Sequence, residues 1–138
     1  MLRDYEVVLK AAADPNRARV LKMLEGGELC VCQIVAVLGL SESTVSKHLS
    51  LLRGAGLVEE RKRGRWAHCR LADSRANEYA KPVLSLVRRW LRDEPVVRTD
   101  AERVARIRQI PVEELCSLSP SALGRKLAAA AAKGASRG

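Results

Sequence analysis

The sequence predicts a mainly α-helical fold with one small β-hairpin. Apolar residues recur at helical spacing through the first half of the chain, and two short runs flank a turn at Gly64. With 138 residues, the chain has the length of one domain that can bury a core. We expect that domain to span residues 1–94, followed by an extension over residues 95–138.

Two helices are expected at the start of the chain. Residues 5–13 carry apolar side chains at helical spacing, and Asp14 and Pro15 then reset the backbone. Asp14 is a favourable N-cap, and Pro15 suits the first helical position because that position needs no amide donor. Gly26 and Gly27 should end the second helix, because glycine tolerates the left-handed cap conformation.

A helix-turn-helix pattern follows. A short helix over about residues 30–38 leads through Gly39 into a helix capped by Ser41 and reaching Arg53. Apolar residues four and seven positions from Val45 form the stripe that this helix should bury. Its other faces carry short polar side chains and one lysine, which suit close approach to the major groove of DNA. These candidate DNA-contacting residues are Ser43, Thr44, Ser46, Lys47 and His48.

The hairpin over residues 57–71 carries a run of cations at its tip. Arg61, Arg63 and Arg65 flank the turn glycine and could reach phosphates or a narrow minor groove. We expect Trp66 to pack at the base of the hairpin. The net charge of +9 also favours a polyanionic partner, although basic proteins of other classes share this property.

The second half of the chain is predicted to hold two more helices. A fifth helix should begin near the N-cap Asp73 and extend past Trp90, with an apolar face suited to a dimer interface with the first helix. Residues 99–102 have the capping-box pattern and should open a short helix through Gln109. From Ser119 onward we expect a flexible basic tail.

Cysteines provide the candidate ligands. No apolar run reaches the roughly 20 residues of a membrane span, and the N-terminus has no signal-peptide core, so we expect a cytoplasmic protein without membrane contact. The four cysteines should then be free thiols or metal ligands.

Cys30 and Cys32 are two residues apart, and such side chains differ by about 200° on an α-helix. Both can bind one ion only where this turn is extended or unwound, which suggests a switch.

These patterns resemble the ArsR/SmtB family of metal-responsive winged-helix repressors, over roughly residues 5–90. The run Glu28-Leu29-Cys30-Val31-Cys32 looks like the family's metal-binding box, and residues 40–49 look like its recognition helix. The resemblance implies a winged helix-turn-helix homodimer that binds operator DNA and releases it when a toxic ion is captured. It implies no catalytic activity and no organic cofactor.

The same resemblance suggests the ion. Cys30 and Cys32 match the first two thiolate ligands of arsenic and antimony sensors, whereas the third cysteine of some of them falls at Val35 here. Arsenite or antimonite is therefore the expected effector, with cadmium or lead as alternatives. Zinc is disfavoured because the fifth helix contains no histidine. The start of a helix is expected to lower the pKa of these thiols.

The third ligand stays open at this stage. Cys116 follows a break at Pro111 and could fold back, or reach across a dimer, to complete a three-sulfur site; it could equally be an apolar residue of the extension. Cys69 is expected to be a small strand residue in the hairpin.

Two other classes of function remain open from the sequence alone. One is a thiol-redox regulator or oxidoreductase in which Cys30 and Cys32 form a disulfide, although the C-x-x-C spacing of thioredoxin-like enzymes is missing. The other is a winged-helix module that binds protein, which the basic hairpin and the polar helix face disfavour.

Overall fold

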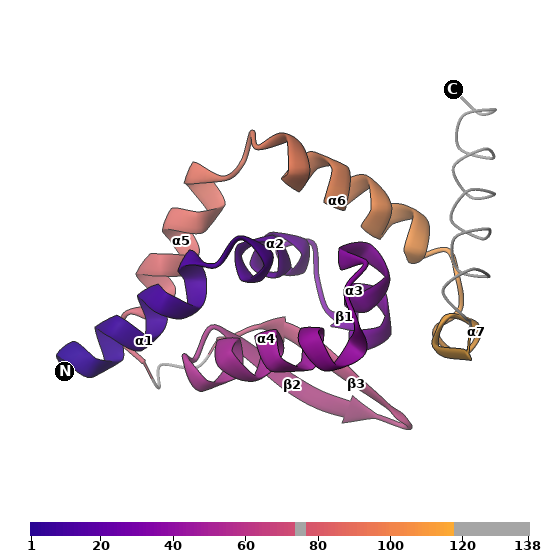
Figure 1. The fold of residues 1–138 in the computed structure, drawn as a ribbon, viewed down its shortest axis with the longest axis horizontal. Helices are drawn as coiled ribbons and strands as arrows, with labels where there is room; N and C mark the ends of the chain where they lie inside the picture. The colour runs from indigo at the N-terminus through magenta and orange to yellow at the C-terminus, as the bar shows by residue number, and fades with distance from the viewer. Residues whose placement is uncertain (74–76, 118–138) are drawn as a thin grey trace.

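The computed structural model describes residues 1–73 and 77–117. The described residues form a mostly helical fold with one three-stranded antiparallel sheet (Figure 1), so the predicted fold class is confirmed. In chain order the elements are α1 (Leu2–Ala13), α2 (Pro15–Leu24), β1 (Leu29–Cys30), α3 (Val31–Leu38), α4 (Glu42–Gly54), β2 (Val58–Arg63), β3 (Trp66–Leu71), α5 (Ala80–Trp90), α6 (Pro95–Ile107) and α7 (Val112–Ser117). None of the helices in these described ranges is long and apolar enough to cross a membrane.

The helix starts predicted for α2 and α4 are confirmed. The Asp14 carboxylate accepts hydrogen bonds from the amides of Asn16 and Arg17, and the Ser41 hydroxyl accepts one from the amide of Thr44. Gly39 ends α3 with a φ of 68°, a left-handed conformation that glycine adopts without steric cost. The chain can therefore turn directly from α3 into α4.

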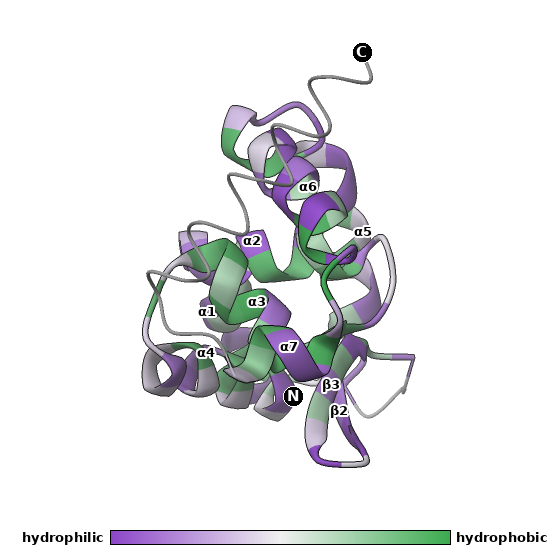
Figure 2. Ribbon diagram, turned by 90° about the vertical axis from the view of Figure 1, so that its right-hand side faces the viewer, coloured by the Kyte–Doolittle hydropathy of each residue, from purple (hydrophilic) through white to green (hydrophobic). Residues whose placement is uncertain are grey.

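The core lies beneath α4, between α1, α2, α3 and the sheet. The predicted stripe of α4 is buried: Val45 and Leu52 are fully enclosed and Leu49 is 2% exposed. On the other side, α6 crosses over α2 and α3, and α7 lies against α3 (Figures 1 and 2). The extension after residue 94 is thus packed on the helix-turn-helix unit as far as the structure describes it.

The sheet contains one strand more than the sequence predicted. Strand β1 pairs with β3, placing Leu29 opposite Cys69 and Cys30 opposite His68, and the strand order is β1-β3-β2. Two residues carry no local signal for a strand, and β1 exists only because β3 supplies its partner. The hydrophilic tip of the β2–β3 hairpin projects from the body (Figure 2).

Three other predictions are wrong. Helix α5 begins at Ala80 rather than near Asp73, which lies in a non-helical segment after β3. Helix α6 begins at Pro95, so Thr99 is an interior residue whose hydroxyl donates to the carbonyl of Pro95. Trp66 pairs with Arg63 beside the turn, at the tip of the hairpin and not at its base. The predicted basic tail from Ser119 lies outside the described residues.

Candidate functional site

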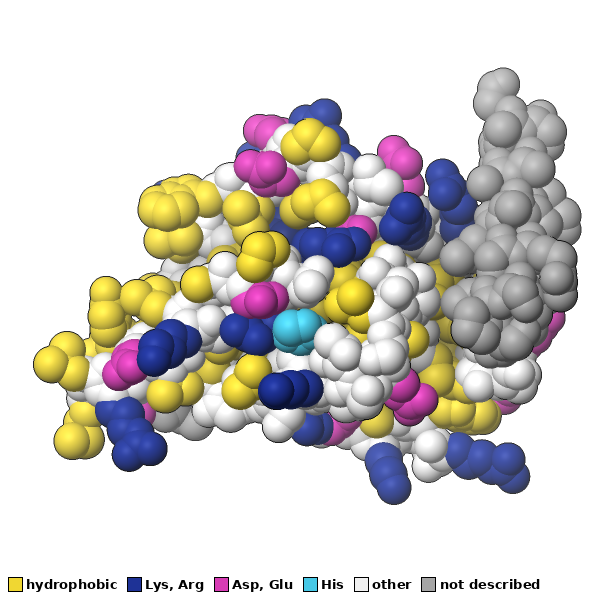
Figure 3. Space-filling view, in the orientation of Figure 1, with side chains coloured by type: hydrophobic (Ala, Val, Ile, Leu, Met, Phe, Trp, Pro, Cys, Tyr) yellow, Lys and Arg dark blue, Asp and Glu magenta, His cyan; other side chains and the backbone are white. Residues whose placement is uncertain are grey.

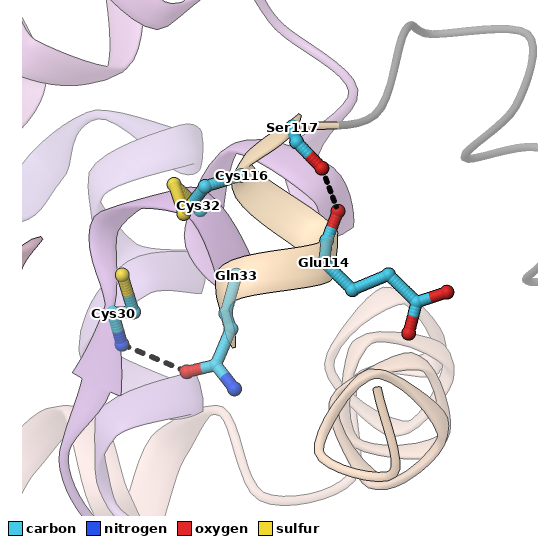
Figure 4. Close-up of a disulfide and its surroundings, with 6 residues drawn as sticks. All are labelled: Cys30, Cys32, Gln33, Glu114, Cys116 and Ser117. Atoms are coloured by element: carbon cyan, nitrogen blue, oxygen red, sulfur yellow. Dashed lines mark hydrogen bonds between the residues drawn. A yellow bond between two sulfur atoms is a disulfide. The ribbon is translucent and has the colours of Figure 1, made fainter. Parts of the chain in front are cut away.

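Three cysteine sulfurs meet where α3 and α7 come together. The sulfurs of Cys30, Cys32 and Cys116 all lie within 4.8 Å of one another. Cys32 and Cys116 are joined as a disulfide with their Cα atoms 5.6 Å apart, and Cys30 is a free thiol beside them (Figure 4). The structure therefore brings together the three cysteines that the sequence singled out.

The backbone at Cys30 explains how two cysteines so close in sequence share one site. Cys30 is the N-cap of α3 with an extended conformation, φ −69° and ψ 147°, and Cys32 already belongs to the helix. The amide of Cys30 donates to Oε1 of Gln33 at 2.8 Å, which holds the cap in place (Figure 4). The turn is thus extended, which is one of the two conditions under which the sequence analysis allowed both thiols to bind one ion.

The alternative of a disulfide between Cys30 and Cys32 is wrong, since Cys32 pairs with Cys116 and leaves Cys30 free. The expectation that all four cysteines are free thiols or metal ligands fails for this pair. The expected lowering of the thiol pKa fails at Cys30. Burial raises the pKa of this thiol, and the backbone N–H groups of Cys32, Gln33 and Val31 offset that effect only in part. Cys30 therefore stays protonated at neutral pH.

Cys69 lies apart from this cluster as a core residue. Its side chain is fully buried in β3, and burial raises its pKa to about 11. It stands opposite Leu29 in the sheet, one residue before Cys30. These features agree with the prediction of a small strand residue.

The donor set of the cluster suits a soft ion. Thiolates that share one ion at bond lengths of roughly 2.3 Å lie at most about 4.6 Å apart, and the three sulfurs here lie within 4.8 Å of one another. Breaking the Cys32–Cys116 disulfide by reduction would free all three sulfurs. Soft thiolates favour thiophilic ions over the hard cations that prefer carboxylates.

The candidate DNA-contacting residues of α4 form an exposed surface. Ser43, Thr44, Ser46 and Lys47 are exposed, while the Ser41 hydroxyl bonds with the hydroxyls near the helix start. His48 is only half-buried, and its Nδ1 lies 3.3 Å from Nη1 of Arg17. Arg17 also donates to the carbonyls of Lys10 and Ala11 at the end of α1. Arg17 therefore joins α1 to the middle of α4.

The cations of the β2–β3 hairpin, which we call the wing, are less independent than the sequence suggested. Arg61 and Arg63 both form ion pairs with Glu28, which the sequence analysis did not single out as a functional residue. Arg65 is exposed at the turn, where Gly64 has a φ of 64°. A carboxylate two residues before Cys30 was a signal in the sequence, but its partners come from a hairpin more than 30 residues away.

An apolar groove with a volume of about 590 Å³ opens at the end of the molecule opposite to α7 (Figure 1). Hydrophobic side chains gather there over α1 and α5 (Figure 3). Trp90 is 71% exposed and Leu9 39% exposed at this surface. The other lining residues include Ala12, Val83, Val87 and Val96.

Comparison with known proteins agrees with this arrangement. Residues 14–60 match the family described as bacterial regulatory protein, arsR family. The chain is 42% identical over 96 residues to the HTH-type transcriptional regulator CmtR of Mycobacterium tuberculosis, covering 70% of this chain and 79% of that protein. It is 44% identical over 66 residues to the arsenical resistance operon repressor of Escherichia coli, covering 47% of this chain and 56% of the repressor. The latter alignment spans about half of the repressor's length.

The fold is also similar to that of solved regulators. HlyU from Vibrio cholerae superimposes with a TM-score of 0.55 at 34% sequence identity, covering 63% of this chain and 90% of that one.

Proposed function

Because this chain belongs to the arsR family of bacterial regulatory proteins, we propose that it is a repressor that releases its operator when its cysteine thiolates capture trivalent arsenic or antimony. Members of this family are DNA-binding transcriptional regulators and not enzymes. They respond to metal ions such as arsenic and cadmium. The observation that carries the proposal is the meeting of three cysteine sulfurs from α3 and α7.

The ion is proposed from the donor set. Cys30, Cys32 and Cys116 offer three sulfurs, the number that a pyramidal arsenic or antimony centre takes, and cadmium and lead remain the alternatives. In this proposal residues 1–94 read DNA, and the extension over residues 95–138 supplies the third sulfur through α7. The similarity to a repressor named for arsenical resistance supports arsenic.

The position of Cys32 in the fold connects ion capture to the DNA-reading helix. Cys32 lies in α3, and α3 leads through the Gly39 turn into α4, so a shift of α3 changes how α4 is presented. Lys47 and the hydroxyl side chains of α4 would enter the major groove, while the wing approaches phosphates or the minor groove. A homodimer would place two such helices one turn of DNA apart, with the apolar groove of α1 and α5 at its interface.

The test is a pair of serine variants. Cys30→Ser and Cys32→Ser should keep operator affinity in the reduced protein but lose release by arsenite, because serine is a poor ligand for a soft ion. Fluorescence anisotropy of labelled operator would follow release on titration with arsenite, antimonite, cadmium, lead and zinc. Dissociation of either variant at wild-type arsenite concentrations would contradict the proposal.

A second function is favoured by the Cys32–Cys116 disulfide. Hydrogen peroxide could oxidise these two thiols, giving one disulfide and two waters, and thereby remove two of the three ion ligands. Operator release by peroxide in wild type but not in Cys116→Ser would support redox sensing. Release by arsenite alone would leave the ion as the signal.

A further inference from the structure

One carboxylate lies between the thiol cluster and the wing. Oε1 of Glu28 is 2.9 Å from Nε of Arg61, and its Oε2 is 3.5 Å from Nε of Arg63. The same Oε2 is 4.0 Å from Nδ1 of His68. The Glu28 side chain is 20% exposed, whereas those of the two arginines are about half exposed. A single carboxylate therefore pairs with two wing cations at once.

The sheet fixes the position of this carboxylate. Glu28 immediately precedes β1, and the pairing of Cys30 with His68 and of His68 with Arg61 places these three residues in one row across the sheet. Residues that stand directly opposite on neighbouring strands point to the same face. The backbone that carries Cys30 thus also determines where the Glu28 side chain can reach.

The pairing reduces the charge that the wing offers to DNA. Each cation that neutralises a phosphate releases counterions and adds about 0.9 to the slope of log affinity against log salt. Arg61 and Arg63 meet a competing anion within their own chain.

We propose that Glu28 couples the thiol cluster to the wing by withholding Arg61 and Arg63 from operator phosphates. In the ion-free protein, phosphates compete with Glu28 for the two arginines. When Cys30 and Cys32 hold an ion, the segment that carries Glu28 is fixed, and the phosphates displace the carboxylate less readily. Glu28 is a positioning residue that acts on DNA through its arginines. The ion-dependent half of this inference rests on the proposed function.

The first test uses reduced, ion-free protein and needs no effector. Glu28→Gln should tighten operator binding about threefold to fivefold at low salt, the scale of one exposed ion pair, and steepen the salt slope by up to about 1. Glu59→Gln is the matched control, since it changes the net charge equally on the same sheet but pairs with Arg70. Equal effects of the two variants would show a general charge effect and overturn the proposal.

A double-mutant cycle tests the route through the arginines. In a protein carrying Arg61→Ala and Arg63→Ala, Glu28→Gln should leave operator affinity unchanged. If Glu28→Gln still tightens operator binding in the protein that lacks the two arginines, its effect does not depend on them and the proposal is wrong. If circular dichroism shows that Glu28→Gln folds poorly, Glu28→Asp replaces it. The shorter aspartate side chain cannot pair with both arginines, so the same tightening of operator binding is expected.

The effector arm separates this inference from the proposed function. Arsenite should weaken operator binding less in Glu28→Gln than in wild type, while arsenite stoichiometry, followed by ultraviolet absorbance of the sulfur–arsenic bonds, stays unchanged. If Cys32→Ser is still released by arsenite, the proposed function fails and the ion-free result for Glu28 stands alone. If the cysteine variants lose release and Glu28→Gln keeps it in full, the coupling through Glu28 is wrong.

Discussion

The free thiol of Cys30 and the disulfide partners Cys32 and Cys116 differ in what they contribute to ion capture. Cys30 and Cys32 come from one turn of chain, and their separation is set locally by the cap of α3. Cys116 arrives from α7, 84 residues after Cys32, and is placed by the packing of α7 on α3. The pair can form without the extension, but the full cluster cannot.

Removing Cys116 should therefore weaken the site without abolishing it. Cys116→Ser is expected to lower arsenite affinity and reduce the sulfur count seen by X-ray absorption from three to two. The control is Cys69→Ala, which removes the remaining thiol without burying a hydroxyl in the core position that Cys69 occupies. An unchanged three-sulfur signal in Cys116→Ser would exclude this cysteine as a ligand.

Protonation of Cys30 predicts how pH affects different ions. Because burial raises the pKa of this thiol, cadmium must displace a proton to bind it, and cadmium affinity should rise with pH by up to about tenfold per unit for each protonated thiol. Arsenite binds as a neutral hydroxide whose three hydroxyls leave as water with the thiol protons, so its affinity should change little between pH 6 and 8.

Isothermal titration across that pH range would measure both ions on reduced protein. Cys30→Ser should reduce the slope of the cadmium profile by about one proton. A flat cadmium profile in wild type would mean that the thiols are already ionised, against the effect of burial on Cys30.

At the scale of elements, buried contacts fasten the extension to the helix-turn-helix unit. The Asp100 carboxylate of α6, 2% exposed, receives hydrogen bonds from Nε and Nη2 of Arg19 in α2, at 2.8 and 2.9 Å. Arg19 also donates to Asn16. On the α3 side, Arg103 donates to the carbonyl of Val37 at 3.4 Å. Helix α6 thus packs against both α2 and α3, and the chain continues from its end into α7, which carries Cys116.

Breaking this buried pair should loosen the extension. Asp100→Ala leaves the Arg19 charge largely buried without its partner and should lower the free energy of unfolding by about 3 kcal/mol. The control is Asp93→Ala, which breaks an exposed pair with Arg98 and should cost less than about 1 kcal/mol. Urea unfolding of both variants would measure the difference, and equal losses would show that the buried pair does not secure α6.

The elements differ in how far the sequence could predict them. Helix α4 was predicted closely because Ser41, Gly39 and the Val45 stripe are local signals. Strand β1 was missed because its two residues depend on pairing with β3. The start of α6 was misplaced because Thr99 to Glu102 has a capping-box sequence, whereas Pro95 opens the helix and Asp100 is held by Arg19.

The residues of the candidate site also differ in how far the sequence could predict them. Cys30 and Cys32 could be singled out from their spacing, and Cys116 could be named only as one of two readings, because its place depends on the packing of α6 and α7. Glu28 was part of the quoted box, yet its pairing with Arg61 and Arg63 arises from the order of the strands.

At the scale of the whole molecule, the apolar groove and the DNA-facing surface lie on different elements. The groove is formed by α1, α2, α5 and α6, whereas α4 and the hairpin carry the polar and cationic residues. A second copy covering the groove would leave both DNA-reading helices free. Its exposed tryptophan and aliphatic side chains have the apolar character of the core of a homodimer interface.

If the groove is the interface of the proposed homodimer, placing a charge in it should both separate the two protomers and weaken operator binding. Trp90→Glu is expected to give a folded monomer, because Trp90 is 71% exposed and contributes little to the core, and to reduce operator affinity by more than tenfold. The salt slope should also fall to about half, since one protomer contacts half of the phosphates. The control is Ala101→Glu, which places the same charge at an exposed position of α6 that does not line the groove and does not lie on α4. Sedimentation velocity and anisotropy at several salt concentrations measure both properties, and a Trp90→Glu protein that stays dimeric would place the interface elsewhere.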